Sequence, residues 1–253
     1  MFPYRDDNEP QRLAIVTVAL IGLNVLSWFV VQGAGATLPL AKSVCELGLI
    51  PGELTGALPG GTRFPMGPGL VCGTAPGRPV SSLLTSMFVH GSWLHLVGNM
   101  WFLWLFGNNV EDAMGQRRFA VFYLVSGLAA ALGQVVTHPS SAVPMVGASG
   151  AISGIMGGYL VLSPQVRVFV CIPLGFFLTS VALPAWVVLG AWFLLQVVSG
   201  VAAFGGEGGG VALWAHVGGF VTGVVLVKLL THPESVAAHR AHHRRPRRVR
   251  RDG

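Results

Sequence analysis

The chain has 253 residues, of which 52% are hydrophobic and only 10% are charged, and its formal net charge is +6. So few charged side chains could not solvate the surface of a soluble domain of this size, which excludes a soluble globular protein. The hydrophobic residues collect in runs long enough to span a bilayer. We therefore predict an all-α polytopic membrane protein that forms a bundle of six transmembrane helices.

Six hydrophobic runs follow one another along the chain. They cover residues 14–32, 93–110, 119–136, 146–162, 184–200 and 211–230. Several are close to about 17 residues, the short limit for a helix that crosses the hydrocarbon layer. Residues 168–183, between the fourth and fifth runs, are hydrophobic as well, but Pro173 and Pro184 interrupt this part of the chain. We predict that residues 168–183 form an interfacial or re-entrant segment.

Lys and Arg residues indicate the orientation. With six spans both termini lie on one side, and the loops of that side contain Arg117, Arg118, Arg167 and Lys228. Because cationic loops stay in the cytoplasm, we predict cytoplasmic termini, in the inner membrane of a bacterial cell. The predicted parts of the chain are a cytoplasmic N-terminal segment, a six-span domain that includes a long outer loop, and a basic cytoplasmic tail. Their ranges are 1–13, 14–230 with the outer loop at 33–92, and 231–253.

The tail carries most of the charge. Residues 239–253 contain seven Arg and one Asp, which together equal the net charge of the whole chain. One interpretation is nucleic-acid binding. The other is a disordered segment that sets the orientation and contacts anionic lipid. We favour the lipid interpretation and expect no nucleic-acid partner.

The three cysteines fall in two regions. Cys45 and Cys72 both lie in the predicted outer loop, where oxidation can occur, so a disulfide and two free thiols are both open interpretations. Cys171 lies in the membrane or on its inner side.

Two polar residues lie inside predicted spans. Ser149 is near the start of the fourth span and His216 is near the start of the sixth. A polar group in hydrocarbon is costly unless it has a partner or a function. A Ser and a His within reach of each other are the minimum requirement for nucleophilic catalysis.

Small residues recur at every fourth position beside this pair. The two stripes are Gly150, Gly154 and Gly158 in the fourth span and Ala215, Gly219 and Gly223 in the sixth. Such stripes allow two helix backbones to approach closely, although they are also common in ordinary membrane-helix packing. If the stripes pack together, Ser149 and His216 lie at the same depth.

Three further polar residues occur around the start of the second span. His95 and Asn99 are four residues apart and therefore share a helix face. Both side chains can donate hydrogen bonds to an oxyanion, as can the backbone N–H of Ser149. The alternative is a polar network that holds the first loop onto the second span, and for His90 we favour this structural role.

Several motifs together resemble the rhomboid family of intramembrane serine proteases. They are Thr85-Ser86-Met87-Phe88-Val89-His90 with Gly98-Asn99-Met100, Gly107-Asn108-Asn109-Val110-Glu111-Asp112 with Gly115 and Arg118, Gly147-Ala148-Ser149-Gly150, and Ala215-His216-Val217-Gly218-Gly219 with Gly223. The resemblance covers about residues 5–230 and keeps the order of the family's motifs.

The resemblance implies a six-helix rhomboid bundle with a catalytic dyad and neither metal nor cofactor. Ser149 would be the nucleophile and His216 the general base and acid, with His95, Asn99 and the Ser149 N–H forming the oxyanion site. We predict that the substrates are single-span membrane proteins, cut near the outer end of their helix. We also predict a small side chain before the cleaved bond, because Gly147, Ala148 and Gly150 crowd the site. Some members carry a Tyr that packs on the catalytic His, where this chain has Ser153.

Other chemistries fit less well. A zinc protease would place two His four residues apart around a Glu, whereas His90 and His95 are five apart. An aspartyl protease needs Asp residues inside spans, and a transporter would show an intramembrane carboxylate. A non-catalytic rhomboid relative that binds membrane helices is the remaining alternative. Such relatives typically lack the Ser or the His, and this chain keeps both.

Overall fold

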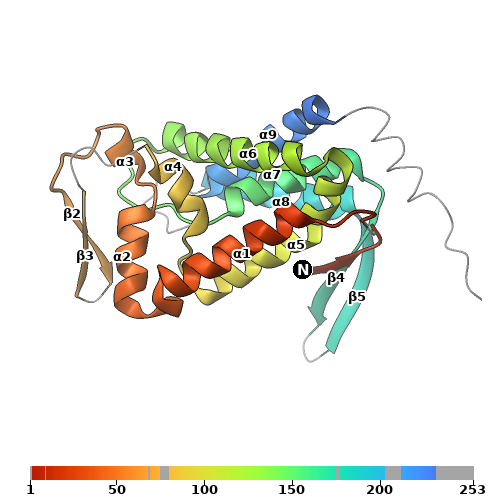
Figure 1. Cartoon of the computed structure of the whole chain (residues 1–253), viewed down its shortest axis with the longest axis horizontal. Coiled ribbons are helices and arrows are strands. Elements are labelled where there is room, and N and C mark those ends of the chain that lie inside the picture. Colours follow the sequence, from red (N-terminus) through yellow and green to blue (C-terminus); the bar gives the residue numbers. More distant parts are fainter. Residues whose placement is uncertain are drawn as a thin grey trace, which may run out of the picture.

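Long helices dominate the computed structural model, which describes residues 2–8, 10–67, 69–74, 80–174, 177–202 and 212–231. The long helices run side by side along one axis of the molecule (Figure 1). They are α1 Ile15–Val30, α5 Trp93–Met114, α6 Gln116–Thr137, α7 Ser149–Leu162, α8 Ala185–Ala202 and α9 Leu213–Leu230. The helices α6, α8 and α9 are long and apolar enough to cross a membrane, and α1 and α7 are shorter apolar helices. The predicted helical membrane bundle is confirmed, while the number of six crossings stays a prediction.

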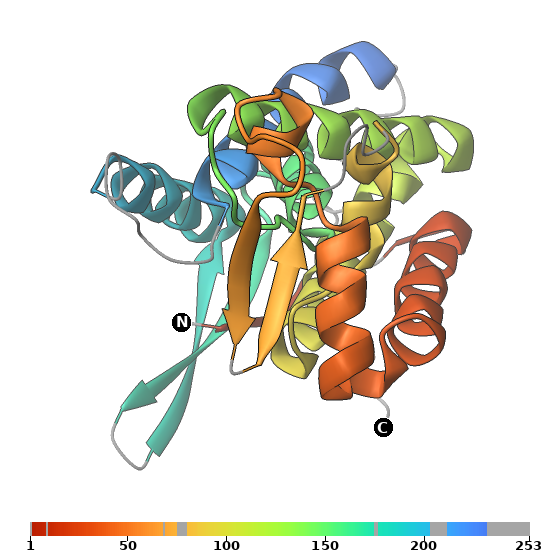
Figure 2. The same ribbon diagram turned by 90° about the vertical axis from the view of Figure 1, so that its left-hand side faces the viewer.

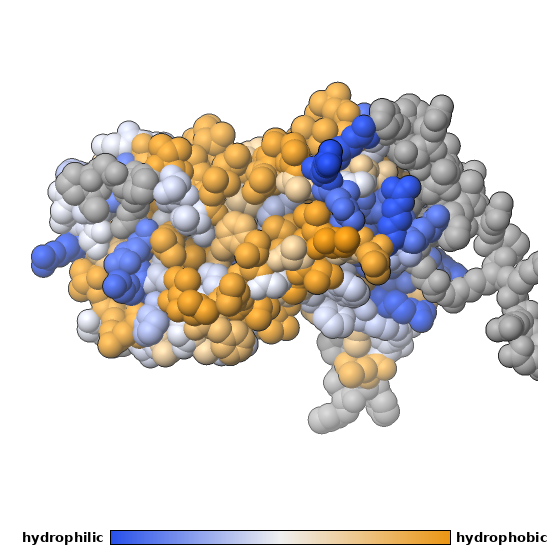
Figure 3. All heavy atoms as spheres, viewed as in Figure 1, coloured by the Kyte–Doolittle hydropathy of each residue, from blue (hydrophilic) through white to orange (hydrophobic). Residues whose placement is uncertain are grey.

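The surface agrees with a membrane environment. Apolar residues form a broad band around the middle of the visible face, and polar residues gather toward its two ends (Figure 3). On α1, which lies at the front of this view, the side chains of Val18, Leu26 and Phe29 are more than half exposed. Because water would make such exposure unfavourable, this band is the face that contacts lipid.

The centre of the bundle is α7. Ten of its fourteen residues are buried, and its neighbours are α5, α6 and α9. The start of α1 is held by a carboxylate at the end of α5: Glu111 accepts hydrogen bonds from the backbone N–H groups of Val16 and Thr17 at 2.9 and 2.8 Å. The carboxylate satisfies N–H groups that a helix start otherwise leaves without partners.

A β-hairpin at one end of the bundle was not predicted. The strands β4 Arg167–Leu174 and β5 Phe177–Pro184 pair antiparallel, and β1 Phe2–Asp6 adds to β4 as a third strand. Figures 1 and 2 show the hairpin projecting from the bundle. The prediction of an interfacial or re-entrant segment at 168–183 did not include strand pairing. The partner strand β1 lies more than 160 residues earlier in the chain, so no local sequence pattern predicts the pairing.

Shorter elements and a second small sheet cover the opposite end. They are the 3₁₀ turns Gly33–Gly35 and Ser86–Phe88, α2 Thr37–Leu47, α3 Pro51–Leu54, α4 Ser82–Thr85, β2 Arg63–Gly67 and β3 Leu70–Gly73. A disulfide joins Cys45 of α2 to Cys72 of β3, with 5.6 Å between the Cα atoms. This bond decides between the two interpretations of these cysteines. The two small sheets are therefore the exceptions to an otherwise all-α fold.

Candidate active site

The helices α7 and α9 meet backbone to backbone. A Cβ atom built on Gly219 would overlap the carbonyl of Gly150, and one built on Gly223 would overlap the carbonyl of Gly154. A Cβ on Gly154 would also overlap the side chain of Ser126 in α6. The two small-residue stripes thus face each other, and glycine is required because any side chain would separate the helices.

This close contact brings the two polar residues together. The Nε2 atom of His216 lies 2.8 Å from the Oγ atom of Ser149, although the residues are 67 positions apart. Ser149 is the first residue of α7 and follows Gly147, whose φ of +115° favours glycine. The side chain of Ser153, one turn later, donates a hydrogen bond to the Ser149 carbonyl at 2.7 Å.

The other ring nitrogen of His216 has a partner from α8. Its Nδ1 atom lies 2.9 Å from Oε1 of Gln196. The Trp192 ring, on the same helix, lies 5.9 Å from the imidazole. We did not select Gln196 from the sequence, although it is a polar residue inside a predicted span, the same signal that drew attention to Ser149 and His216.

The side chains of His95 and Asn99 lie against the loop that leads into Ser149. A Cβ on Gly147 would be 2.6 Å from His95 Nε2 and 3.3 Å from Asn99 Nδ2. The helix α5 begins at Trp93 because Ser92 caps it, accepting a hydrogen bond from the His95 backbone N–H at 3.1 Å. This start sets the position of both side chains. The Asn99 Nδ2 atom is buried and has no hydrogen-bond partner among the described residues.

The ring protonation of His95 follows from its contacts. Its Nδ1 accepts a hydrogen bond from the backbone N–H of Gly91 at 3.3 Å. A neutral imidazole then carries its proton on Nε2, the atom that faces Gly147. Two donors, from His95 and Asn99, therefore point at the same stretch of backbone.

His90 lies beside these donors, and its backbone is fixed by hydrogen bonds to Gln32. Gln32, two residues after the end of α1, accepts a hydrogen bond from the His90 N–H at 2.8 Å and donates one to the His90 carbonyl at 2.7 Å. The His90 ring packs edge-on against the ring of His95 at 5.1 Å. These contacts tie the outer segment to α1 and α5, and the structural role of His90 stays a prediction.

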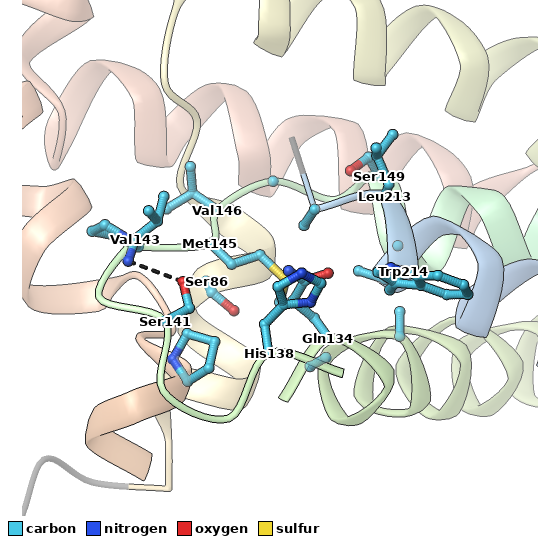
Figure 4. Close-up of a pocket in the computed structure, with 18 of the residues that line it drawn as sticks. Ser86, Gln134, His138, Ser141, Val143, Met145, Val146, Ser149, Leu213 and Trp214 are labelled. Atoms are coloured by element: carbon cyan, nitrogen blue, oxygen red, sulfur yellow. Dashed lines mark hydrogen bonds between the residues drawn. The ribbon is translucent and has the colours of Figure 1, made fainter. Parts of the chain in front are cut away.

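A cavity of about 1450 Å³ opens beside Ser149 and His216. His95 also lines it, and the loop between α6 and α7 forms one wall. Figure 4 shows Gln134, His138 and Trp214 among the lining side chains, with Ser149 at one side of the hollow. A cavity of this size that reaches a hydroxyl–imidazole pair has room for an extended peptide and for water. Within the described ranges, no group of three His, Cys, Asp or Glu residues is arranged to hold a metal ion.

Comparisons with known proteins agree on one family. The family model described as "Rhomboid domain" matches residues 78–233. "Putative rhomboid protease YdcA" from Bacillus subtilis is 40% identical over 78 residues, which are 31% of this chain and 39% of that protein. "Rhomboid protein 1, mitochondrial" from Saccharomyces cerevisiae is 30% identical over 148 residues, which are 57% of this chain and 40% of that protein. "RHOMBOID-like protein 5" from Arabidopsis thaliana is 36% identical over 78 residues, which are 31% of this chain and 25% of that protein.

The matched region includes the parts of the chain that build the site. It contains the Ser149–His216 pair, the α5 donors and the small-residue stripes of α7 and α9. The chain spans between a quarter and two fifths of the length of these three curated relatives. Since the domain match extends over more than half of the chain, and since its apolar helices suit a bilayer, this integral membrane protein belongs to the rhomboid family.

Proposed function

We propose that this protein is an intramembrane serine protease that cleaves membrane-protein substrates with a Ser149–His216 dyad. The observation that carries the proposal is the 2.8 Å contact between Ser149 Oγ and His216 Nε2 at the edge of a cavity. A serine hydroxyl is a weak nucleophile at neutral pH and needs an adjacent base. The imidazole is placed to accept its proton.

The reaction proceeds by acyl transfer. Ser149 Oγ attacks the carbonyl carbon of the substrate while its proton passes to His216 Nε2, and His216 then protonates the leaving amine. Water hydrolyses the resulting ester, again with His216 as the base. The negative charge on the carbonyl oxygen is stabilised by the Ser149 backbone N–H, Asn99 Nδ2 and His95 Nε2. The buried Asn99 Nδ2, which lacks a partner, supports this role. No step needs a metal or a cofactor.

The substrates we propose are single-span membrane proteins. A transmembrane helix hides its peptide bonds behind internal hydrogen bonds, so the segment to be cut must unwind before it reaches Ser149. We propose residues 14–230 as the catalytic domain, with both termini cytoplasmic. The curated relatives include mitochondrial proteins, so they do not support a bacterial inner membrane in particular. The basic tail and its contact with anionic lipid lie outside the described residues.

Substitution of the dyad tests the proposal. We expect Ser149→Ala and His216→Ala each to lower the rate of cleavage of a single-span substrate by about a thousandfold or more. The thermal unfolding temperature should stay unchanged, and a fluorophosphonate should label wild type but not Ser149→Ala. Ser199→Ala, which removes an exposed hydroxyl from α8, is the control and should behave as wild type. Cleavage at the wild-type rate by a folded Ser149→Ala variant would contradict the mechanism.

A further inference from the structure

Gln196 is an exception in its helix. The sequence of α8 is AWVVLGAWFLLQVVSGVA, in which Gln196 is the only amide, and its neighbours Leu194, Leu195 and Val198 face outward. A polar amide in an apolar span is unfavourable unless it makes a hydrogen bond. In this structure the Gln196 amide oxygen makes that bond, to His216 Nδ1 at 2.9 Å.

The bond determines which nitrogen of the imidazole carries the proton. An amide oxygen can only accept, so His216 Nδ1 must be the donor, and the Nε2 lone pair is left free. Nε2 is the atom that faces Ser149 Oγ at 2.8 Å. The tautomer held by Gln196 is therefore the one that can remove the proton from the serine hydroxyl. The opposite tautomer would place a donor against Oγ and would have no base there.

The two contacts of His216 with α8 come from one face of that helix. Trp192 and Gln196 are four residues apart, so their side chains lie above one another. The Trp192 ring packs at 5.9 Å from the imidazole while Gln196 binds its Nδ1 edge. Ser153 of α7 instead turns back to the Ser149 carbonyl. Orientation of the imidazole thus depends on α8, a helix in which only Ala185, Leu189 and Gly200 are buried.

We propose that Gln196 is a positioning residue that extends the proposed dyad to a hydrogen-bonded row of Ser149, His216 and Gln196, an inference that rests on the proposed function. The amide holds the imidazole in its productive tautomer and rotation through a neutral hydrogen bond. It occupies the position that a third orienting group takes in serine-type sites. Gln196 acts through His216, at the ring nitrogen that does not face Ser149.

Three variants test this role in the full-length protein in detergent. We expect Gln196→Leu to lower kcat by about 10- to 100-fold, the usual loss when an orienting partner is removed, with KM changed less than about twofold. The rate of fluorophosphonate labelling should fall by a similar factor. Gln196→Glu keeps an oxygen acceptor and should recover most of the lost rate. Ser199→Leu places a leucine elsewhere on α8 and should leave kcat unchanged.

A spectroscopic measurement tests the tautomer of His216 directly. Nitrogen NMR of the wild-type protein labelled with ¹⁵N-histidine should show His216 protonated at Nδ1 and unprotonated at Nε2 near neutral pH. In Gln196→Leu this signature should be lost or mixed. A wild-type His216 protonated at Nε2 would overturn the inference, as would a Gln196→Leu enzyme with the kcat of wild type. Ser149→Ala in the cleavage assay separates the two proposals. An active Ser149→Ala enzyme would refute the proposed function itself, whereas an inactive one leaves the role of Gln196 to be decided by its own variants.

Discussion

The two ends of α7 differ in how the buried polar groups around them are hydrogen-bonded. At the Ser149 end the helix opens onto a cavity, and the buried donor Asn99 Nδ2 beside it has no partner. At the other end Tyr159 is buried, and its hydroxyl donates to Oδ2 of Asp6 at 2.5 Å. Asn109 of α5 donates to the same oxygen at 3.1 Å. A donor beside one end of the helix therefore lacks a partner, whereas the Tyr159 hydroxyl at the other end has one.

The contrast teaches how a hydrophobic bundle can support a polar site. An unsatisfied buried donor is unfavourable for folding, and it persists where a ligand can supply the missing partner. The hydrogen bonds of Tyr159 and Asn109 to Asp6 offset that cost by fixing the register of α7. Asp6 belongs to β1, which pairs with β4, and Asp7 forms an ion pair with Arg167 at 2.8 Å. The N-terminal strand therefore anchors the helix whose far end carries Ser149.

Gly223→Val should disturb the packing of α7 along its length, and we expect it to have the largest effect on stability and on the reactivity of Ser149. The new side chain would overlap the Gly154 carbonyl, so α7 and α9 must separate, and we expect a loss of about 3 kcal/mol or more in the free energy of unfolding. Fluorophosphonate labelling of Ser149 should be lost with it. Thermal unfolding in detergent measures the first effect. Gly190→Val on α8 is the matched control, because a Cβ there meets nothing within 4 Å. A stable and reactive Gly223→Val protein would refute the close packing.

Tyr159→Phe should affect only the end of α7 that bonds to Asp6. It removes a hydrogen bond to a carboxylate, which contributes about 1.5 to 3 kcal/mol to the free energy of unfolding. We expect that loss in chemical denaturation, with kcat unchanged at a temperature where the variant is folded. Tyr4→Phe, which removes an exposed hydrogen bond to Ser180, should cost about 0.5 kcal/mol or less. If Tyr159→Phe lowers kcat without lowering stability, the two ends do not act independently.

The pH dependence of stability should report on Asp6, with the smallest effect of the three. Burial, the main cause, raises the pKa of Asp6 from 3.8 to about 6. The folded state therefore favours the protonated carboxyl. The resulting stabilisation is full below about pH 4, falls as the pH rises through about 6, and is absent above it. Because Asp6 is only partly buried, we expect a change of about 1 to 2 kcal/mol over this range. Denaturation of Asp6→Asn at several pH values should show a flatter profile, and a profile as steep as that of wild type would assign the dependence to another group.

The class of protein and the residues worth testing follow from the sequence alone. Scarce charge and long apolar runs are local properties, so they predict a helical membrane bundle without any knowledge of its packing. A hydroxyl and an imidazole inside such runs stand out for the same reason. The repeated small residues beside Ser149 and His216 indicate which helix faces can approach each other. The structure brings these residues within hydrogen-bond reach, and their catalytic roles stay a prediction.

Other features depend on how the elements are placed in space, and only the tertiary structure decided them. The β1–β4 pairing joins segments more than 160 residues apart, and the Asp6–Tyr159 bond spans 153 positions. The partner of His216 Nδ1 depends on the rotation of α8 about its own axis, which brings Gln196 to the imidazole and turns Leu195 away. Nearly every residue of α8 is apolar, so its hydrophobic pattern does not specify a face. The rotation of α8 depends on its contacts with α9, α7 and the β4–β5 hairpin, and those contacts exist only in the folded bundle.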